Sequence, residues 1–120
     1  MEVNNLNNTY FEYVPIIKAI SDPTRLKIID MLSCGELCAC DILESVDISQ
    51  STLSYHMNIL TECKLINGIK DGSWMRYSIN KEKSAWLLSF LNNLVEVKEE
   101  CICKSINKNS KDYYCHKEEK

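Results

Sequence analysis

Residues Cys38–Glu62, CACDILESVDISQSTLSYHMNILTE, hold two stretches of helical periodicity separated by a very short turn. The first stretch predicts a short helix from Cys38 to Ser45, and Ser49 can cap a longer helix that runs to about Glu62. The turn between the two helices is Val46-Asp47-Ile48. Two helices joined this closely have the outline of a helix-turn-helix, so this segment decides the expected fold.

A β-hairpin is predicted directly after the second of these helices. Residues Leu65–Ile69 favour a strand, Lys70–Ser73 a turn that contains Asp-Gly, and Trp74–Ile79 a return strand with alternating side chains. A helix-turn-helix followed by a hairpin is a winged helix-turn-helix.

Two further helices are predicted ahead of this segment. Apolar residues recur at nearly helical spacing from Thr9 to Ile20. Asp22 can then cap a second helix, and Pro23 suits its first position. The residues of this second helix that are expected to face the core are Leu26, Ile29 and Leu32.

A last helix is predicted from Asn80 to about Glu100, with apolar residues on more than one face. A helix that is apolar over that width needs a second partner, and in so small a chain the expected partner is another copy. We therefore expect a mainly α, dimeric fold with one hairpin, in which four helices precede the two strands and one follows. Residues 1–100 would form the DNA-binding and dimerisation domain, and residues 101–120 a flexible tail that contains cysteines.

Composition argues against several classes of protein. No apolar run approaches the roughly 18 residues of a membrane span, and the Asn-rich start does not resemble a signal peptide, so we expect a cytoplasmic protein without membrane contact. No motif for an enzyme is found. The net charge is −3, but residues 49–83 are net positive, which indicates where phosphates would be met.

The outward face of the second helix of the helix-turn-helix is small and polar, whereas Leu53, Met57 and Leu60 face the core. Gln and Asn pair with adenine, and Ser and Thr bond to base edges or phosphates. In an alternative interpretation this is a solvated face of a partner-binding domain, and His56 a core histidine. The candidate DNA-binding residues are Gln50, Ser51, Thr52, Ser54, Tyr55, His56 and Asn58 on the helix, with Lys70 and Arg76 on the wing.

Seven cysteines in a chain without an export signal favour metal binding or redox chemistry over a disulfide framework. Cys34, Cys38 and Cys40 lie close together, and thiolates suit soft metals as well as trivalent arsenic or antimony. On an ideal helix, residues i and i+2 point about 200° apart. A shared ion therefore requires an irregular first turn or distorts the helix on binding, which would misplace the DNA-contacting helix. Alternatively, some of these cysteines are small buried hydrophobes.

Four segments resemble the ArsR/SmtB family of metal-responsive repressors, and the resemblance spans roughly residues 10–98. They are DPTRL at 22–26, ELCACD at 36–41, ISQSTLSYH at 48–56 and the Asp71-Gly72 wing. The second is similar to the site of the arsenic-responsive and cadmium/lead-responsive branches. The resemblance implies a homodimer on double-stranded operator DNA with inverted repeats, released by an inducer and requiring no cofactor.

The chain departs from the family patterns around the expected inducer site. Many arsenic-responsive members carry a third cysteine where this chain has Leu43, and the arm cysteines of the cadmium/lead branch are missing. No histidine occurs from Asn80 to Val97, where the zinc and nickel branches have a site. A third thiolate would come from Cys34, or from Cys101 and Cys103 of either subunit.

These observations favour a repressor released by As(III) or Sb(III), because such a site needs only three thiolates. One alternative is a repressor of the same fold that responds to Cd(II), Pb(II) or Zn(II) through four thiolates. Another is a thiol redox switch, in which peroxide releases DNA without any metal.

Overall fold

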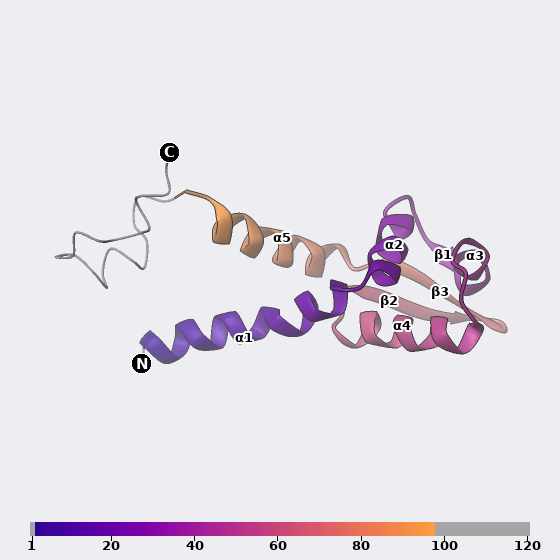
Figure 1. Ribbon diagram of the computed structural model, residues 1–120, viewed down its shortest axis with the longest axis horizontal. Coiled ribbons are helices and arrows are strands. Elements are labelled where there is room, and N and C mark those ends of the chain that lie inside the picture. Colours follow the sequence, from indigo (N-terminus) through magenta and orange to yellow (C-terminus); the bar gives the residue numbers. More distant parts are fainter. Residues whose placement is uncertain (1, 98–120) are drawn as a thin grey trace. The chain divides into compact units, whose positions relative to one another are not determined.

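The structure, a computed structural model, describes residues 2–97, with side chains from Tyr10 onward. The chain divides into two compact units, residues 1–90 and 91–120, and all described elements except the end of α5 lie in the first (Figure 1). The helices and strands are α1 (Glu2–Ile20), α2 (Pro23–Leu32), β1 (Leu37–Cys38), α3 (Ala39–Ser45), α4 (Gln50–Glu62), β2 (Ile66–Asp71), β3 (Trp74–Ile79) and α5 (Lys81–Val95).

The predicted winged helix-turn-helix is confirmed: α3 and α4 form the helix pair, and β2 and β3 form the wing. In Figure 1, α4 runs alongside the hairpin, with which it makes contacts through β2. The last helix ends at Val95, whereas the sequence predicted an end near Glu100, which lies outside the described residues. The predicted tail at 101–120 also lies outside them.

The sheet has one strand more than predicted. The short strand β1 pairs antiparallel with β3, which gives the order β1-β3-β2. The strand β2 also extends to Asp71, so only two residues, Gly72 and Ser73, form the turn. Gly72 has φ +66, a left-handed conformation that glycine adopts without steric cost.

The helix starts follow local side-chain chemistry. The carboxylate of Asp22 accepts hydrogen bonds from the backbone N–H groups of Thr24 and Arg25, over 2.9 and 3.1 Å, and Pro23 stands at the first helical position, as predicted. At the start of α3 the prediction was one residue early, because Cys38 is the residue before the helix rather than its first.

The core lies where α1, α2, α3, α4 and the hairpin converge. Ile28, Ile42 and Leu60 are fully buried. The prediction for α2 was wrong at Leu26, which is 52% exposed, since Ile28 and Leu32 take the inward positions. In α4 the predicted core positions are confirmed. They are Leu53, Met57 and Leu60.

Aromatic stacking joins α1 to the first part of α5. The ring of Tyr13 stacks on that of Phe90, with centroids 3.7 Å apart, and on that of Trp86 at 4.0 Å. Lys83 Nζ lies 3.9 Å from the Trp86 ring centroid, a cation–π arrangement. These contacts hold the two helices together within the first unit.

Candidate DNA interface and thiol site

The exposed face of α4 consists of small polar side chains and one tyrosine. It lies opposite the buried core residues of the helix, and Tyr55, at 61% exposure, is its largest member. Hydroxyl, amide and phenol groups on such a face are donors and acceptors suited to base edges and phosphates. The predicted residues that the structure brings together here are Gln50, Ser51, Thr52, Ser54, Tyr55 and Asn58.

The first turn of α4 is fixed by hydroxyl groups. Ser49 Oγ accepts a hydrogen bond from the backbone N–H of Thr52 at 3.2 Å and donates one to Thr52 Oγ1 at 3.0 Å. Ser51 Oγ lies 3.2 Å from Ser49 Oγ. This cap satisfies one of the free N–H groups of the helix and orders the turn that exposes Gln50 and Ser51.

His56 does not belong to this exposed face, which corrects its inclusion among the DNA-contacting residues. Its side chain is only 9% exposed, and its Nδ1 lies 2.8 Å from Nη1 of Arg25. A guanidinium can only donate, so Nδ1 is the acceptor in this hydrogen bond. His56 is a core histidine that bonds α4 to α2.

Arg25 connects three helices, a role that sequence reasoning missed. Its Nε donates to the carbonyl oxygen of Ala19 in α1 at 2.6 Å, in addition to the bond to His56 in α4. Its backbone N–H donates to Asp22, and this bond, helped by the nearby guanidinium charge, lowers the pKa of the Asp22 carboxyl. No local pattern could identify His56 as the partner, because it lies 31 residues away along the chain.

The wing carries the two basic candidates. Lys70 on β2 is exposed and pairs with Met75 across the hairpin. Arg76 Nε lies 2.9 Å from Asp71 Oδ2, with the two side chains 41% and 62% exposed. Because an ion pair this exposed contributes little stability, a phosphate can compete for Arg76.

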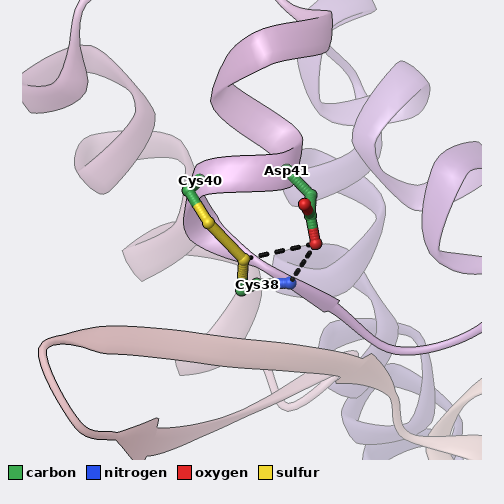
Figure 2. Close-up of side chains that lie close together, drawn as sticks. All are labelled: Cys38, Cys40 and Asp41. Carbon is green, nitrogen blue, oxygen red and sulfur yellow. Dashed lines mark hydrogen bonds between the residues drawn. A yellow bond between two sulfur atoms is a disulfide. The ribbon is translucent and has the colours of Figure 1, made fainter.

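Two of the predicted thiol ligands meet at the start of α3. The sulfur atoms of Cys38 and Cys40 form a disulfide, with Cα atoms 5.4 Å apart (Figure 2). Asp41 Oδ2 lies 3.2 Å from the backbone nitrogen of Cys38 and 3.2 Å from its Sγ. Both cysteines are half-buried and Asp41 is exposed. The ligand atoms of the three residues lie within 4.8 Å of one another, so they can contact one ion.

The backbone at Cys38 explains how the two sulfurs converge. Cys38 is extended, with φ −89 and ψ 162, whereas Cys40 lies inside the helix. The angular separation of positions i and i+2 on an ideal helix therefore does not apply to this pair. Of the two possibilities left open by the sequence, the irregular start is observed, because Cys38 precedes α3 in an extended conformation.

The remaining cysteines are not part of this cluster as far as the structure describes them. Cys34 is exposed in the turn after α2, and its sulfur is not among the clustered ligand atoms. Cys63 is half-buried at the end of α4, where its thiol donates to the carbonyl oxygen of Leu60 at 3.4 Å. Cys101 and Cys103 lie outside the described residues, so the third ligand stays a prediction.

The thiol pair is attached to the wing through the sheet. Leu37 pairs with Tyr77, and Cys38 pairs with Arg76. Tyr77 is anchored in the core at 8% exposure, and this burial raises the pKa of its phenol. A displacement of Cys38 therefore acts on the strand that carries Arg76 as well as on α3.

A polar, exposed second helix and a basic wing on this scaffold define a winged helix-turn-helix DNA-binding regulator. Residues 22–67 match the family described as "Bacterial regulatory protein, arsR family", which spans α2 to the start of the wing. The chain belongs to the arsR family of bacterial transcriptional regulators. Proteins of this family regulate transcription and are not enzymes.

The relatives extend the match over most of the chain. The arsenical resistance operon repressor of Staphylococcus aureus is 42% identical over 98 residues, which cover 82% of this chain and 94% of that protein. The transcriptional repressor SdpR of Bacillus subtilis is 41% identical over 64% of this chain and 90% of its own length. An ArsR-like transcriptional regulator from Rhodococcus sp. RHA1 superposes with a TM-score of 0.64 at 25% identity, covering 72% of this chain and 82% of that one.

Among the described residues, none of the helices is both long and apolar enough to cross a membrane.

Proposed function

We propose that this chain is a homodimeric repressor that leaves its operator DNA when As(III) or Sb(III) binds cysteine thiolates. The observation that carries the proposal is the convergence of the Cys38 and Cys40 sulfurs at the start of the helix-turn-helix. Soft, thiol-seeking elements are the natural ligands of such a pair once it is reduced. The similarity to an arsenical resistance operon repressor supports the same ligand class.

DNA binding would use the exposed face of α4 in the major groove and the wing on the backbone. Gln50, Ser54 and Asn58 are the groups best suited to base edges, and Lys70 and Arg76 to phosphates. Inducer binding would displace Cys38. This displacement would shift α3, which begins after Cys38, and β3, in which Arg76 pairs with Cys38. A coupling free energy of about 1–3 kcal/mol is typical of such linked sites.

Exposed apolar side chains on α1 and α5 support the homodimer. Phe11 on α1 is 68% exposed and Leu88 on α5 is 62% exposed. Apolar side chains exposed on two packed helices are the kind of surface that a second copy covers. The dimer would place two α4 helices about one helical turn of DNA apart.

The test is operator binding by fluorescence anisotropy, with a duplex selected by the protein from a random pool. Arsenite, antimonite, Cd(II), Pb(II) and Zn(II) are added in turn to the reduced protein, and peroxide to a separate sample. We expect release by arsenite and antimonite. Release by Cd(II), Pb(II) or Zn(II), without release by arsenite or antimonite, would instead support the metal-sensing repressor, in which extra ligands complete the site.

Single substitutions locate the response. Cys38→Ser and Cys40→Ser should keep operator affinity and abolish release, whereas Cys63→Ser, at a thiol outside the cluster, should keep both. Normal release from both cluster variants would show that the inducer binds elsewhere.

The disulfide favours a second candidate function, a thiol redox switch. The sulfur atoms of Cys38 and Cys40 form a disulfide at the start of α3, the first helix of the helix-turn-helix. A redox switch predicts that peroxide releases DNA reversibly and that arsenite does not. If the oxidised protein instead keeps its operator affinity, the disulfide is only an oxidised form of the inducer site.

A further inference from the structure

A cavity of about 110 Å³ lies between the start of α4 and the wing. Its wall is formed by residues of α3, of α4 and of the hairpin around Ser73–Met75. The α4 residues in the wall are Gln50, Leu53, Ser54 and Met57. Their i, i+3, i+4, i+7 spacing places them on one side of the helix. The cavity therefore lies along the border between the core side of α4 and the exposed face that carries the candidate DNA-binding residues.

The wall of this cavity is apolar inside and polar at its border. The apolar side chains come from three elements and are buried or half-buried. They are Leu43, Leu53, Met57 and Met75. Gln50 and Ser54, in contrast, are exposed. A group that enters the cavity therefore meets carbon and sulfur atoms inside and hydrogen-bonding groups at the border.

Thymine presents a matching combination in the major groove of DNA. Its C5-methyl group stands next to the O4 acceptor, and the paired adenine offers N6 and N7. Apolar side chains contact the thymine methyl, whereas Gln bonds to adenine. The volume also suits a small group, because an apolar cavity of about 150 Å³ holds one benzene molecule. Sites for drug-sized ligands are larger, at about 300–1,000 Å³.

We propose that this cavity reads the C5-methyl group of one thymine in each operator half-site, while Gln50 and Ser54 bond to the polar base edges beside it. The proposal rests on the proposed function, because it requires α4 to enter the major groove. It gives Leu43 and Met75, which are not among the predicted DNA-binding residues, a part in sequence specificity. Cytosine cannot replace this thymine, since it lacks the methyl group and carries an N4 donor where thymine has the O4 acceptor.

The first experiment removes the methyl group from the DNA. In the duplex that the protein selects from a random pool, each thymine is replaced singly by uracil, which keeps the base pair and loses only the C5-methyl group. Anisotropy with the unmodified chain should show a dissociation constant raised about four-fold at one position of each half-site, as expected for one buried methyl-sized group. If uracil is tolerated at every position, the proposal is overturned.

Substitutions in the wing assign this effect to the cavity. Met75→Ala removes part of the apolar wall, so the ratio of the dissociation constants for the uracil and thymine duplexes should fall from about four to less than about two. Ile69→Ala is the matched control, because Ile69 is apolar and 61% exposed on the same hairpin but is not in the wall. Its ratio should stay near the unmodified value. An unchanged ratio in Met75→Ala would contradict the proposal.

Methionine methyl resonances test the contact in the unmodified chain, which covers the case in which Met75→Ala does not fold. The chain is prepared with isotope-labelled methionine ε-methyl groups and bound in turn to the thymine duplex and to the sensitive uracil duplex. The Met57 and Met75 signals should differ between the two complexes. Met31 lies on α2 and is not in the wall, so its signal should not differ. Equal Met57 and Met75 signals in the two complexes would overturn the proposal.

Arsenite is added to the same complexes, so that the thymine contact and the proposed function are tested separately. If arsenite releases the DNA and no uracil position weakens binding, the thymine contact is wrong while the proposed function stands. If one uracil position weakens binding, Met75→Ala removes that effect and arsenite does not release the DNA, the thymine contact stands and the As(III)/Sb(III) assignment fails.

Discussion

The guanidinium of Arg25 donates a hydrogen bond to Nδ1 of His56, with 2.8 Å between Nη1 and Nδ1. The bond joins the first turn of α2 to the middle of α4. In α4, His56 follows directly after Tyr55, which is 61% exposed, whereas His56 itself is buried. Two adjacent residues of one helix thus serve different purposes, and substitutions at them can separate stability from DNA binding.

We expect His56→Ala to lower the free energy of unfolding by about 1–3 kcal/mol, because Arg25 loses its acceptor in a partly buried position. Urea denaturation followed by circular dichroism measures this loss. Tyr55→Ala is the matched control: it should change stability by less than about 0.5 kcal/mol and instead weaken operator binding in anisotropy. A stable His56→Ala protein with weakened DNA binding would return His56 to the DNA-contacting set.

The sequence predicted the order of the helices and the hairpin because the signals for them are local. Asp22 and Pro23 start α2, Ser49 caps α4, and Gly72 lies in the turn of the hairpin, each within a few residues of the element it defines. The polar face of α4 was predicted for the same reason, since its positions follow from the helical period.

The features that were not predicted depend on residues distant in sequence. The strand β1 has only two residues and exists because Leu37 pairs with Tyr77, which no periodicity within the strand can reveal. The burial of His56 depends on Arg25, and the exposure of Leu26 depends on which face of α2 the other helices cover. The convergence of the cysteines depended on where α3 begins, to within a single residue.

Asp22 should make stability depend on pH in the acid range. Its pKa is lowered from the ordinary 3.8, first by the backbone hydrogen bond from Arg25. A carboxyl whose pKa is lower in the folded than in the unfolded chain stabilises the fold above the unfolded pKa. That contribution is lost as the pH falls through the lower, folded pKa. Stability from this group is therefore complete at pH 7 and declines below about pH 4.

Asp22→Asn tests this dependence, because Asn can still cap the helix but carries no charge. The urea midpoint of the variant should lie below that of the unmodified chain at pH 7, and the gap should close as the pH is lowered past 4. A gap that is the same at pH 7 and pH 3 would mean that the charge of Asp22 contributes nothing beyond the cap.

The ion pair on the wing gives a prediction about DNA affinity. Asp71→Asn should free Arg76 and remove a negative charge near the phosphates, so operator affinity should rise. The turn should survive, since Asp71 is the last residue of β2 and the two turn residues, Gly72 and Ser73, are unchanged. Arg76→Ala should lower the affinity and reduce the slope of log affinity against log salt by about 1 for each bound subunit.

Neither substitution should change the free energy of unfolding by more than about 1 kcal/mol, because the pair is exposed. Anisotropy titrations over a range of salt concentrations measure the slopes. If Asp71→Asn lowered affinity and left the slope unchanged, Arg76 would not meet phosphate.

Gly68 on β2 is expected to be intolerant of a side chain. A Cβ at this position would lie 3.0 Å from Cε1 of Tyr77 and 3.2 Å from Cε of Met75. The Met75 methyl is the end of a flexible chain and can move, but Tyr77 pairs with Gly68 and its ring is buried at 8% exposure. Gly68→Ala therefore has two opposing effects on stability, a gain in conformational entropy and a loss from overpacking against Tyr77.

Alanine in a strand gains about 0.5–1 kcal/mol over glycine in conformational entropy, whereas overpacking a fixed neighbour costs about 1–3 kcal/mol. The cost exceeds the gain, so we expect a net loss of about 1 kcal/mol. Tyr77→Leu removes the ring atoms that a Cβ would meet, so Gly68→Ala should cost less in that background, and a double-mutant cycle by urea denaturation measures the difference. An equal cost in both backgrounds would place the strain in the β2 backbone rather than against the tyrosine.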